Sequence, residues 1–179
     1  MSNIVTYGLD KCYYAVKQGH YIYDTPVPLM GAVSLSVSPN IKVSTAKYIG
    51  NERPIANIDN GYTGKLELAY LSSDFLCNVF GYELDSNGLL IEKKHSTNIL
   101  SFALLFQTQT NNNPVRYCYY ECSCVKPPFQ TETTTDKNNI NRDIIDLTIV
   151  PRHHDDKIRI STTSNTPQSV YDNWFNAVI

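Results

Sequence analysis

Residues 64–88 read GKLELAYLSSDFLCNVFGYELDSNG, and this stretch predicts a strand, a short helix and a turn in succession. Over 65–70 polar and apolar residues alternate, which is the period of a half-buried strand with Leu66 and Leu68 on its inner face. Residues 85–88, Asp-Ser-Asn-Gly, predict a turn because Asn and Gly tolerate positive φ. The whole stretch predicts one helix lying on a sheet.

A capped helix is predicted in the middle of this stretch. Ser72 or Ser73 offers a hydroxyl to the first free amide groups of the helix, and Asp74 places negative charge at its positive end. Gly81 supplies the left-handed residue at which such a helix ends. Apolar residues recur on one side of the segment, at the spacing of a helical turn: Phe75, Leu76, Val79 and Phe80.

The composition favours a mainly β protein with a single domain over residues 1–179. At 42% hydrophobic residues, a chain of this length can bury a core of ordinary size. The 13 Tyr, beside only 2 Met and 1 Trp, favour strands. A net charge of −2 argues against a free nucleic-acid-binding protein. The longest apolar stretch, 99–106, is too short to span a membrane, and the N-terminus lacks the pattern of a secretory signal. We therefore expect folding in the cytosol.

Five cysteines occur without the spacing of a disulfide framework: Cys12, Cys77, Cys118, Cys122 and Cys124. An odd number of cysteines without such spacing is expected for thiols that stay reduced in a reducing compartment. Free cysteine packs as a small hydrophobic residue. We therefore predict five reduced thiols that serve as core residues.

Further strands are predicted from alternating polar and apolar residues. Pro26 and Pro28 withhold two amide donors from a sheet, so their segment is expected to be an edge strand or a crossing segment. The final two strands are expected to pair with each other around a turn at 151–156. The predicted strands cover 12–16, 20–23, 33–37, 89–94, 100–108, 116–125, 143–150 and 157–161.

Two long loops and an apolar C-terminal segment complete the prediction. In 39–63 isolated Ile and Val residues are scattered among polar ones without a period, which predicts a long inter-strand loop, with a strand at 42–49 as the alternative. Residues 129–141 predict a second loop. A Thr-Pro pair opens 166–179, where apolar residues at helical spacing predict a C-terminal amphipathic segment.

The sequence contains no catalytic motif, and its candidate metal sites are weak. Residues 153–156 read His-His-Asp-Asp, but four neighbouring side chains cannot all face one ion, so a solvated turn is expected. Cys118, Cys122 and Cys124 share parity in a strand and offer three thiolates without a located fourth ligand. We therefore predict no enzyme activity, no metal and no cofactor.

Two pairs of aromatic residues leave alternatives open. Tyr117 and Tyr119 share the opposite face of the same strand, as an exposed ladder for a sugar or as a second packed face. Trp174 and Phe175 are either core residues or anchors on a neighbouring molecule. An exposed ladder would make the chain a β-sandwich carbohydrate-binding or receptor-binding module.

Four short motifs occur in one order along the chain. They are Gly8, Leu9 and Tyr14; the segment PVPLMGA at 26–32; the strand, helix and turn of 66–88; and Trp174 with Phe175. Together they resemble the major tail proteins of long-tailed, non-contractile bacteriophages, which form the tail tube. The resemblance covers most of the chain and contains no catalytic signature.

This resemblance implies an antiparallel β-sandwich or barrel of the phage tail tube type, with one flanking α-helix, a long loop and terminal arms. It also implies a virion protein whose hexameric rings stack into the tube through which DNA is ejected into the host. The implied partners are other copies of the chain and the tape measure, tail terminator and distal tail proteins, while DNA passes through the lumen without specific binding. The implied location is the virion tail, assembled in the host bacterial cytoplasm without a membrane.

The expected assembly interface lies in the long loop and the C-terminal segment. A free loop does not need many branched apolar side chains, so a partner is expected to cover those of 39–63. The runner-up function is the binding module described above, and a thiol or metal enzyme is a distant third. The candidate interface residues are Ile41, Val43, Tyr48, Ile49, Ile55, Ile58, Trp174 and Phe175.

Overall fold

The fold is mainly β and antiparallel, as predicted. The computed structural model describes residues 6–19, 21–48, 51–93, 100–110, 113–129 and 142–179, with side chains except at 6–7, 44–48, 51–57 and 110. The main sheet contains eight strands, and two further strands form a separate small sheet. The main-sheet strands are β1 (Thr6–Val16), β2 (Val27–Pro28), β3 (Ala32–Tyr48), β4 (Asn51–Leu68), β7 (Phe102–Thr110), β8 (Val115–Cys124), β9 (Asp143–Val150) and β10 (Arg159–Ser161).

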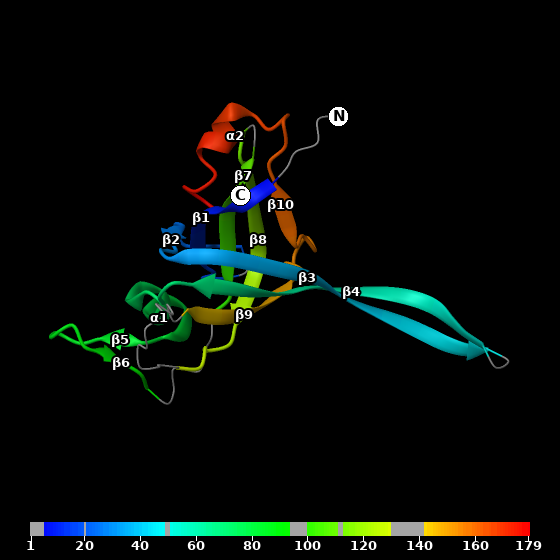
Figure 1. Cartoon of the computed structure of the whole chain (residues 1–179), viewed down its shortest axis with the longest axis horizontal. Coiled ribbons are helices and arrows are strands. Elements are labelled where there is room, and N and C mark those ends of the chain that lie inside the picture. Colours follow the sequence, from blue (N-terminus) through cyan, green and yellow to red (C-terminus); the bar gives the residue numbers. More distant parts are fainter. Residues whose placement is uncertain (1–5, 20, 49–50, 94–99, 111–112, 130–141) are drawn as a thin grey trace, which may run out of the picture.

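The main sheet curls around an apolar interior (Figure 1). Its strand order is β2-β1-β7-β8-β9-β4-β3, and β10 pairs with β8. β1 and β3 stand near opposite ends of this order, yet they approach each other in space. Side chains from both halves of the sheet therefore meet in one core, which includes Tyr14, Leu66, Phe102 and Ile149.

The predicted helix is confirmed as α1 (Ser73–Phe80), and it packs against this core. The Ser72 side chain caps it by accepting a hydrogen bond from the backbone N–H of Phe75 at 3.2 Å. Gly81 ends the helix in the left-handed conformation, with φ of 69°. Phe75 and Val79 are fully buried among strand residues, so the amphipathic pattern positions the helix on the sheet.

A second, smaller core lies on the other face of β1, β7 and β8. Ala15, Leu105 and Tyr120 contribute to it from the sheet, and Trp174 covers them from the C-terminal segment. The predicted amphipathic segment at 166–179 forms only one short helix, α2 (Gln168–Asp172), followed by turns. Packing against the sheet, rather than a continuous helix, therefore holds this segment in place.

The prediction of a long loop at 39–63 is wrong for the described residues, because β3 and β4 pair along most of their length. The alternative, a strand at 42–49, is confirmed over 42–48, which belong to β3. β9 pairs with β4 only between Tyr62 and Leu68. Beyond that point β3 and β4 continue as a two-stranded ribbon, residues 41–48 and 51–59, that projects from the sheet (Figure 1). A ribbon with no buried face has no need to alternate polar and apolar residues, and register shifts further break the period.

The expected pairing of the final two strands is also wrong. β10 pairs with β8, Ile160 opposite Cys118, whereas β9 pairs with β4 on one side and with the last residues of β8 on the other. β9 and β10 therefore follow the same edge of β8, and the segment between them leaves the sheet. A sequence pattern identifies strands, but it does not determine which strand lies beside which.

Several shorter predictions have clear outcomes. The Pro-containing segment is the edge strand β2, as expected. The turn at 85–88 is confirmed, and it joins β5 (Glu83–Leu84) to β6 (Leu90–Ile91). The strand predicted at 89–94 is shorter than expected, because among the described residues only the two of β6 are paired there. The strand predicted at 20–23 is reduced to one bridge between Lys17 and Tyr23. The loop predicted at 129–141 lies outside the described residues except for Phe129.

In the parts of the chain that the structure describes, no helix has the length and apolar character needed to cross a membrane.

Candidate assembly surfaces

The ribbon of β3 and β4 is the most prominent candidate surface. Among the described strands, its segments 41–48 and 51–59 pair only with each other, because β9 joins β4 only from Tyr62 onwards. At about 3.3 Å per residue, eight residues of β3 reach roughly 25 Å beyond the sheet. An isolated two-stranded hairpin is only marginally stable in water. A ribbon of this length is therefore suited to being covered by a second molecule.

Exposed aliphatic side chains occur on both faces of the ribbon. Ile41 and Val43 are 54% and 57% exposed, and they share one face because they are two residues apart. Ile58 is 50% exposed and lies directly opposite Lys42 in the register, on the other face. Three of the eight predicted interface residues are therefore exposed as an interface requires.

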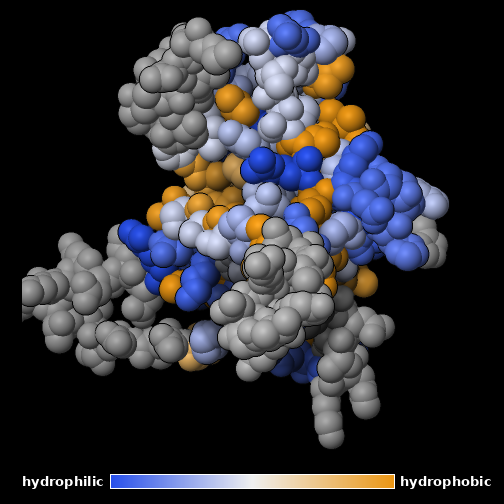
Figure 2. Space-filling model, turned by 90° about the vertical axis from the view of Figure 1, so that its right-hand side faces the viewer, coloured by the Kyte–Doolittle hydropathy of each residue, from blue (hydrophilic) through white to orange (hydrophobic). Residues whose placement is uncertain are grey.

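Three more predicted interface residues fall outside what the structure describes. Ile49 is not among the described residues, and the side chains of Tyr48 and Ile55 are not described, although their backbones belong to β3 and β4. Figure 2 looks at the molecule from the side on which the ribbon projects, where apolar and hydrophilic residues alternate over the surface. The interface prediction for these three residues stays a prediction.

Trp174 and Phe175 belong to the chain's own packing. Trp174 is only 3% exposed, and its indole N–H donates to the Tyr117 carbonyl at 3.4 Å. The Phe175 ring stacks on Tyr13 with centroids 4.6 Å apart, and the Arg116 guanidinium lies 5.1 Å from that ring. The prediction that Trp174 contacts a neighbouring molecule is therefore wrong, because the core beneath the C-terminal segment already buries the indole.

The free edge of β3 is a surface that the sequence did not indicate. β3 is the last strand of the sheet order and pairs with β4 on one side only, as far as the described strands go. An unpaired edge presents a row of N–H and C=O groups that can pair with a strand of another chain. Sheet order depends on pairing between distant segments, so only the structure could reveal this edge.

Of the two alternatives for Tyr117 and Tyr119, the structure shows the packed face rather than an exposed ladder for a sugar. Tyr119 is 4% exposed in the main core, and Tyr117 packs against the same core. Their rings stack with Phe106, at centroid distances of 6.0 and 5.1 Å. These side chains do not present the open platform that a carbohydrate-binding module uses.

The three cysteines of β8 do not line one face, contrary to their shared parity. Cys118 belongs to the second core, whereas Cys122 and Cys124 belong to the main core. A register shift between β7 and β8 places Leu104 opposite Tyr119 but Phe102 opposite Cys122, so β8 carries an extra residue between them. Beyond this bulge, the residues of β8 that would have faced the second core face the main core instead, so Cys122 and Cys124 lie on the opposite face from Cys118.

All five cysteines are free, as predicted, and four of them are buried. Desolvation raises the pKa of the Cys12, Cys118 and Cys124 thiols to about 12. Neutral, buried thiols are poor nucleophiles and poor metal ligands. Within the described ranges, His, Cys, Asp and Glu side chains form no group of three that could hold a metal ion.

The His-His-Asp-Asp segment is a turn whose central carboxylate is already paired. Asp155 accepts hydrogen bonds from Nε and Nη2 of Arg152 at 2.9 and 2.6 Å, and Lys157 Nζ lies 3.2 Å away. The Arg152 hydrogen bond is the main reason that the pKa of Asp155 is lowered well below its usual range. Asp155 therefore stabilises the turn, as the prediction of a turn implies.

No model of a known protein family matches the chain, and no curated protein matches it either.

Proposed function

We propose that this chain is a structural subunit that assembles into stacked hexameric rings, forming the tail tube of a long-tailed, non-contractile bacteriophage. The observation that carries the proposal is the ribbon of β3 and β4. It projects from a curled antiparallel sheet and exposes Ile41, Val43 and Ile58 on its two faces. A second subunit covering these side chains would remove apolar surface from water, which favours association.

Ring formation would use the edges of the sheet. The outer edge of β3 is unpaired along the described strand. At the other end of the sheet order, β2 pairs with Tyr13 and Tyr14 of β1, and the N–H groups of Leu29 and Asp24 donate to the Cys12 and Val16 carbonyls, so among the described residues the β1 edge is open over 6–11. Pairing the β3 edge of one copy with the β1 end of the next is a head-to-tail contact, and such contacts generate closed rings when the rotation from copy to copy closes. The same pairing removes both exposed edges, which are otherwise sites of aggregation.

The charge balance suits a wall past which DNA moves. The chain carries 15 basic and 17 acidic side chains. Each phosphate that a protein neutralises releases counterions and tightens binding, so a wall that must let DNA pass cannot be strongly basic. The proposed role needs no catalysis. Other tail proteins, which would end the tube and set its length, are the expected partners in the virion.

Electron microscopy of the purified protein over a range of concentrations tests this proposal, with sedimentation velocity as a second readout. We expect rings or tubes with a central channel, and their fraction should rise with protein concentration. Glutaraldehyde crosslinking should give bands up to the hexamer. Particles that stay monomeric at every concentration and give no crosslinked hexamer would overturn the proposal.

A further inference from the structure

A second exposed hairpin lies at the opposite end of the molecule from the ribbon. β5 and β6 form a two-stranded sheet of their own, with Leu84 directly opposite Leu90. Directly opposite residues in an antiparallel pair point to the same face, so these two leucines lie side by side. They are 52% and 37% exposed, and Leu89 beside them is 62% exposed. This hairpin therefore carries an apolar patch.

The hairpin is a well-defined structure rather than a loose loop. The Asp85 carboxylate accepts hydrogen bonds from the backbone N–H groups of Asn87 and Leu89, at 2.9 and 2.7 Å. Lys93 forms an ion pair with Glu83 across the hairpin. A surface that is ordered before binding loses less entropy when a partner docks.

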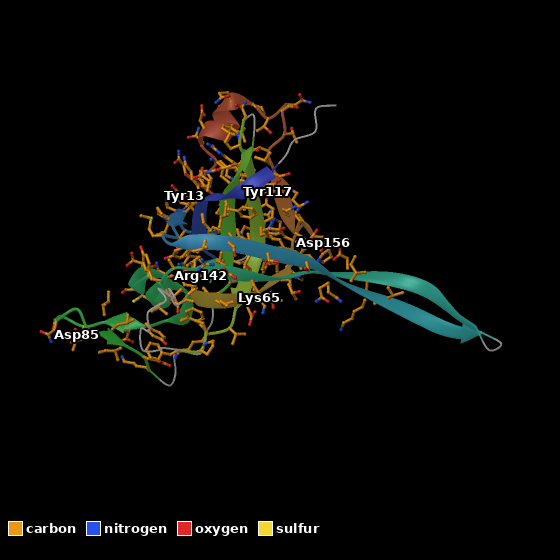
Figure 3. The ribbon with its side chains drawn as sticks, viewed as in Figure 1. Tyr13, Lys65, Asp85, Tyr117, Arg142 and Asp156 are labelled. Carbon is orange, nitrogen blue, oxygen red and sulfur yellow. The ribbon has the colours of Figure 1, made fainter. Side chains whose placement is uncertain are left out.

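The ribbon and the β5–β6 hairpin face away from each other along the long axis of the molecule (Figure 1). Asp85 marks the tip of the hairpin in Figure 3. One chain cannot bring these two ends together, but two copies arranged head to tail can. Two different patches at opposite ends are what a heterologous contact requires, and such contacts repeat from copy to copy.

The charges of the two hairpins are complementary. Segment 41–59 contains three basic and two acidic residues, whereas segment 83–93, which includes the Lys93 partner of Glu83, contains three acidic residues and one basic one. Asp85 stays ionised at the tip, because hydrogen bonding, chiefly from the Leu89 backbone N–H, lowers the pKa of its carboxyl group. Lys42 is exposed on the face of the ribbon that carries Ile58. Complementary charge of this size orients partners more than it adds affinity.

We propose that the ribbon of one copy docks on the β5–β6 hairpin of the next copy, placing the ribbon face that carries Lys42 and Ile58 against the Leu84 and Leu90 region of the hairpin. The proposal rests on the proposed function and names the two surfaces by which one ring holds the next. A ribbon-to-ribbon contact would instead bring two segments of net positive charge together. It would also close a two-fold dimer and stop there.

Two double variants and a matched control test this contact. The ribbon variant is Lys42→Asp with Ile58→Asp, two residues on one face of the ribbon, and the hairpin variant is Leu84→Asp with Leu90→Asp. The control, Ser86→Asp, adds an acidic residue to the same hairpin but removes no apolar side chain. All substituted positions are exposed, so each variant should keep the circular dichroism spectrum of the wild type. If a variant does not, serine replaces aspartate at the same positions.

Each double variant alone should give single rings by electron microscopy, with a loss of stacked species of at least tenfold, while the control stacks like the wild type. Preformed rings of the two variants are then mixed in equal amounts. One intact ribbon surface and one intact hairpin surface remain in the mixture, so we expect pairs of rings and no longer stacks.

The possible failures are distinguishable. If the wild type forms no rings, the proposed function fails, and this contact fails with it. If the hairpin variant stacks as well as the wild type, the contact proposed here is overturned while the tube proposal stands. If mixing the two variants yields no paired rings, the two surfaces do not bind each other, which also overturns the contact and leaves the tube proposal intact.

Discussion

At the scale of single residues, Gly61 determines where the ribbon leaves the sheet. Its φ is +87°, and a Cβ atom at this position would lie 2.1 Å from the carbonyl oxygen of Ile149 in β9. Between the pairs Pro39–Tyr62 and Ile41–Asp59, β4 has one more residue than β3, so the glycine belongs to a β-bulge. Gly61→Ala should lower the free energy of unfolding by about 2–4 kcal/mol, from left-handed strain and from the clash. Urea denaturation measures this loss.

Gly88→Ala is the matched control for that experiment. Gly88 also has a positive φ, +79°, but a Cβ atom there would meet nothing within 4 Å. Its replacement should cost only the conformational strain, about 1 kcal/mol. Equal losses for the two variants would show that the contact with β9 does not constrain Gly61.

At the scale of elements, the cap of α1 offers a test on two adjacent serines. The Ser72 hydroxyl accepts the hydrogen bond from the Phe75 N–H, whereas Ser73 is an exposed residue in the first turn. Ser72→Ala should lower the free energy of unfolding by about 1 kcal/mol. Ser73→Ala should leave it unchanged or raise it by a few tenths, because alanine favours helix. Thermal denaturation of both variants would contradict this if Ser73→Ala were the more destabilised.

The contrast between α1 and the ribbon shows what the sequence could predict. The helix is short and local, and each of its signals lies within ten residues: the cap, the apolar spacing and Gly81. The ribbon gives no such signal, because its strands bury no face and its pairing has shifts in register. The sequence marks Ile41, Val43 and Ile58 as apolar residues in a polar segment, and the structure shows that they are exposed; that a partner covers them stays a prediction.

Long-range relations were the main source of error. Cys118 and Cys122 are an even number of residues apart, which predicts that they share one face of β8. One β-bulge between them puts them on opposite faces. Composition indicated an aromatic C-terminal segment but not whether the chain's own sheet would bury Trp174. The β5–β6 hairpin was missed as a surface because exposure of leucines depends on what packs over them, and no sequence pattern reports that.

At the scale of the whole molecule, the ribbon should be separable from folding. Within the described chain it pairs with nothing but itself, and the core residues lie in the curled sheet. Replacing residues 41–59 with a two-residue Asn-Gly turn should change the free energy of unfolding by less than about 1 kcal/mol, since the closing loop becomes shorter. Stacking of rings, observed by electron microscopy, should be lost.

A shortened protein that unfolds would show that the ribbon supports the sheet. A shortened protein that still forms long tubes would remove the ribbon from the stacking contact. Rings that form but do not stack are the result expected from the two proposals together. The comparison requires equal protein concentrations, because association depends on concentration.

The burial of the thiols bears on how the protein ages outside a cell. Oxidation of cysteine begins at the thiolate and requires access to the sulfur atom. Four of the five cysteine side chains are buried, and desolvation raises the pKa of all five thiols above the ordinary value. The four buried thiols are therefore protected from oxidation in air-saturated water, and the partly exposed Cys77 is the cysteine that an oxidant would reach first.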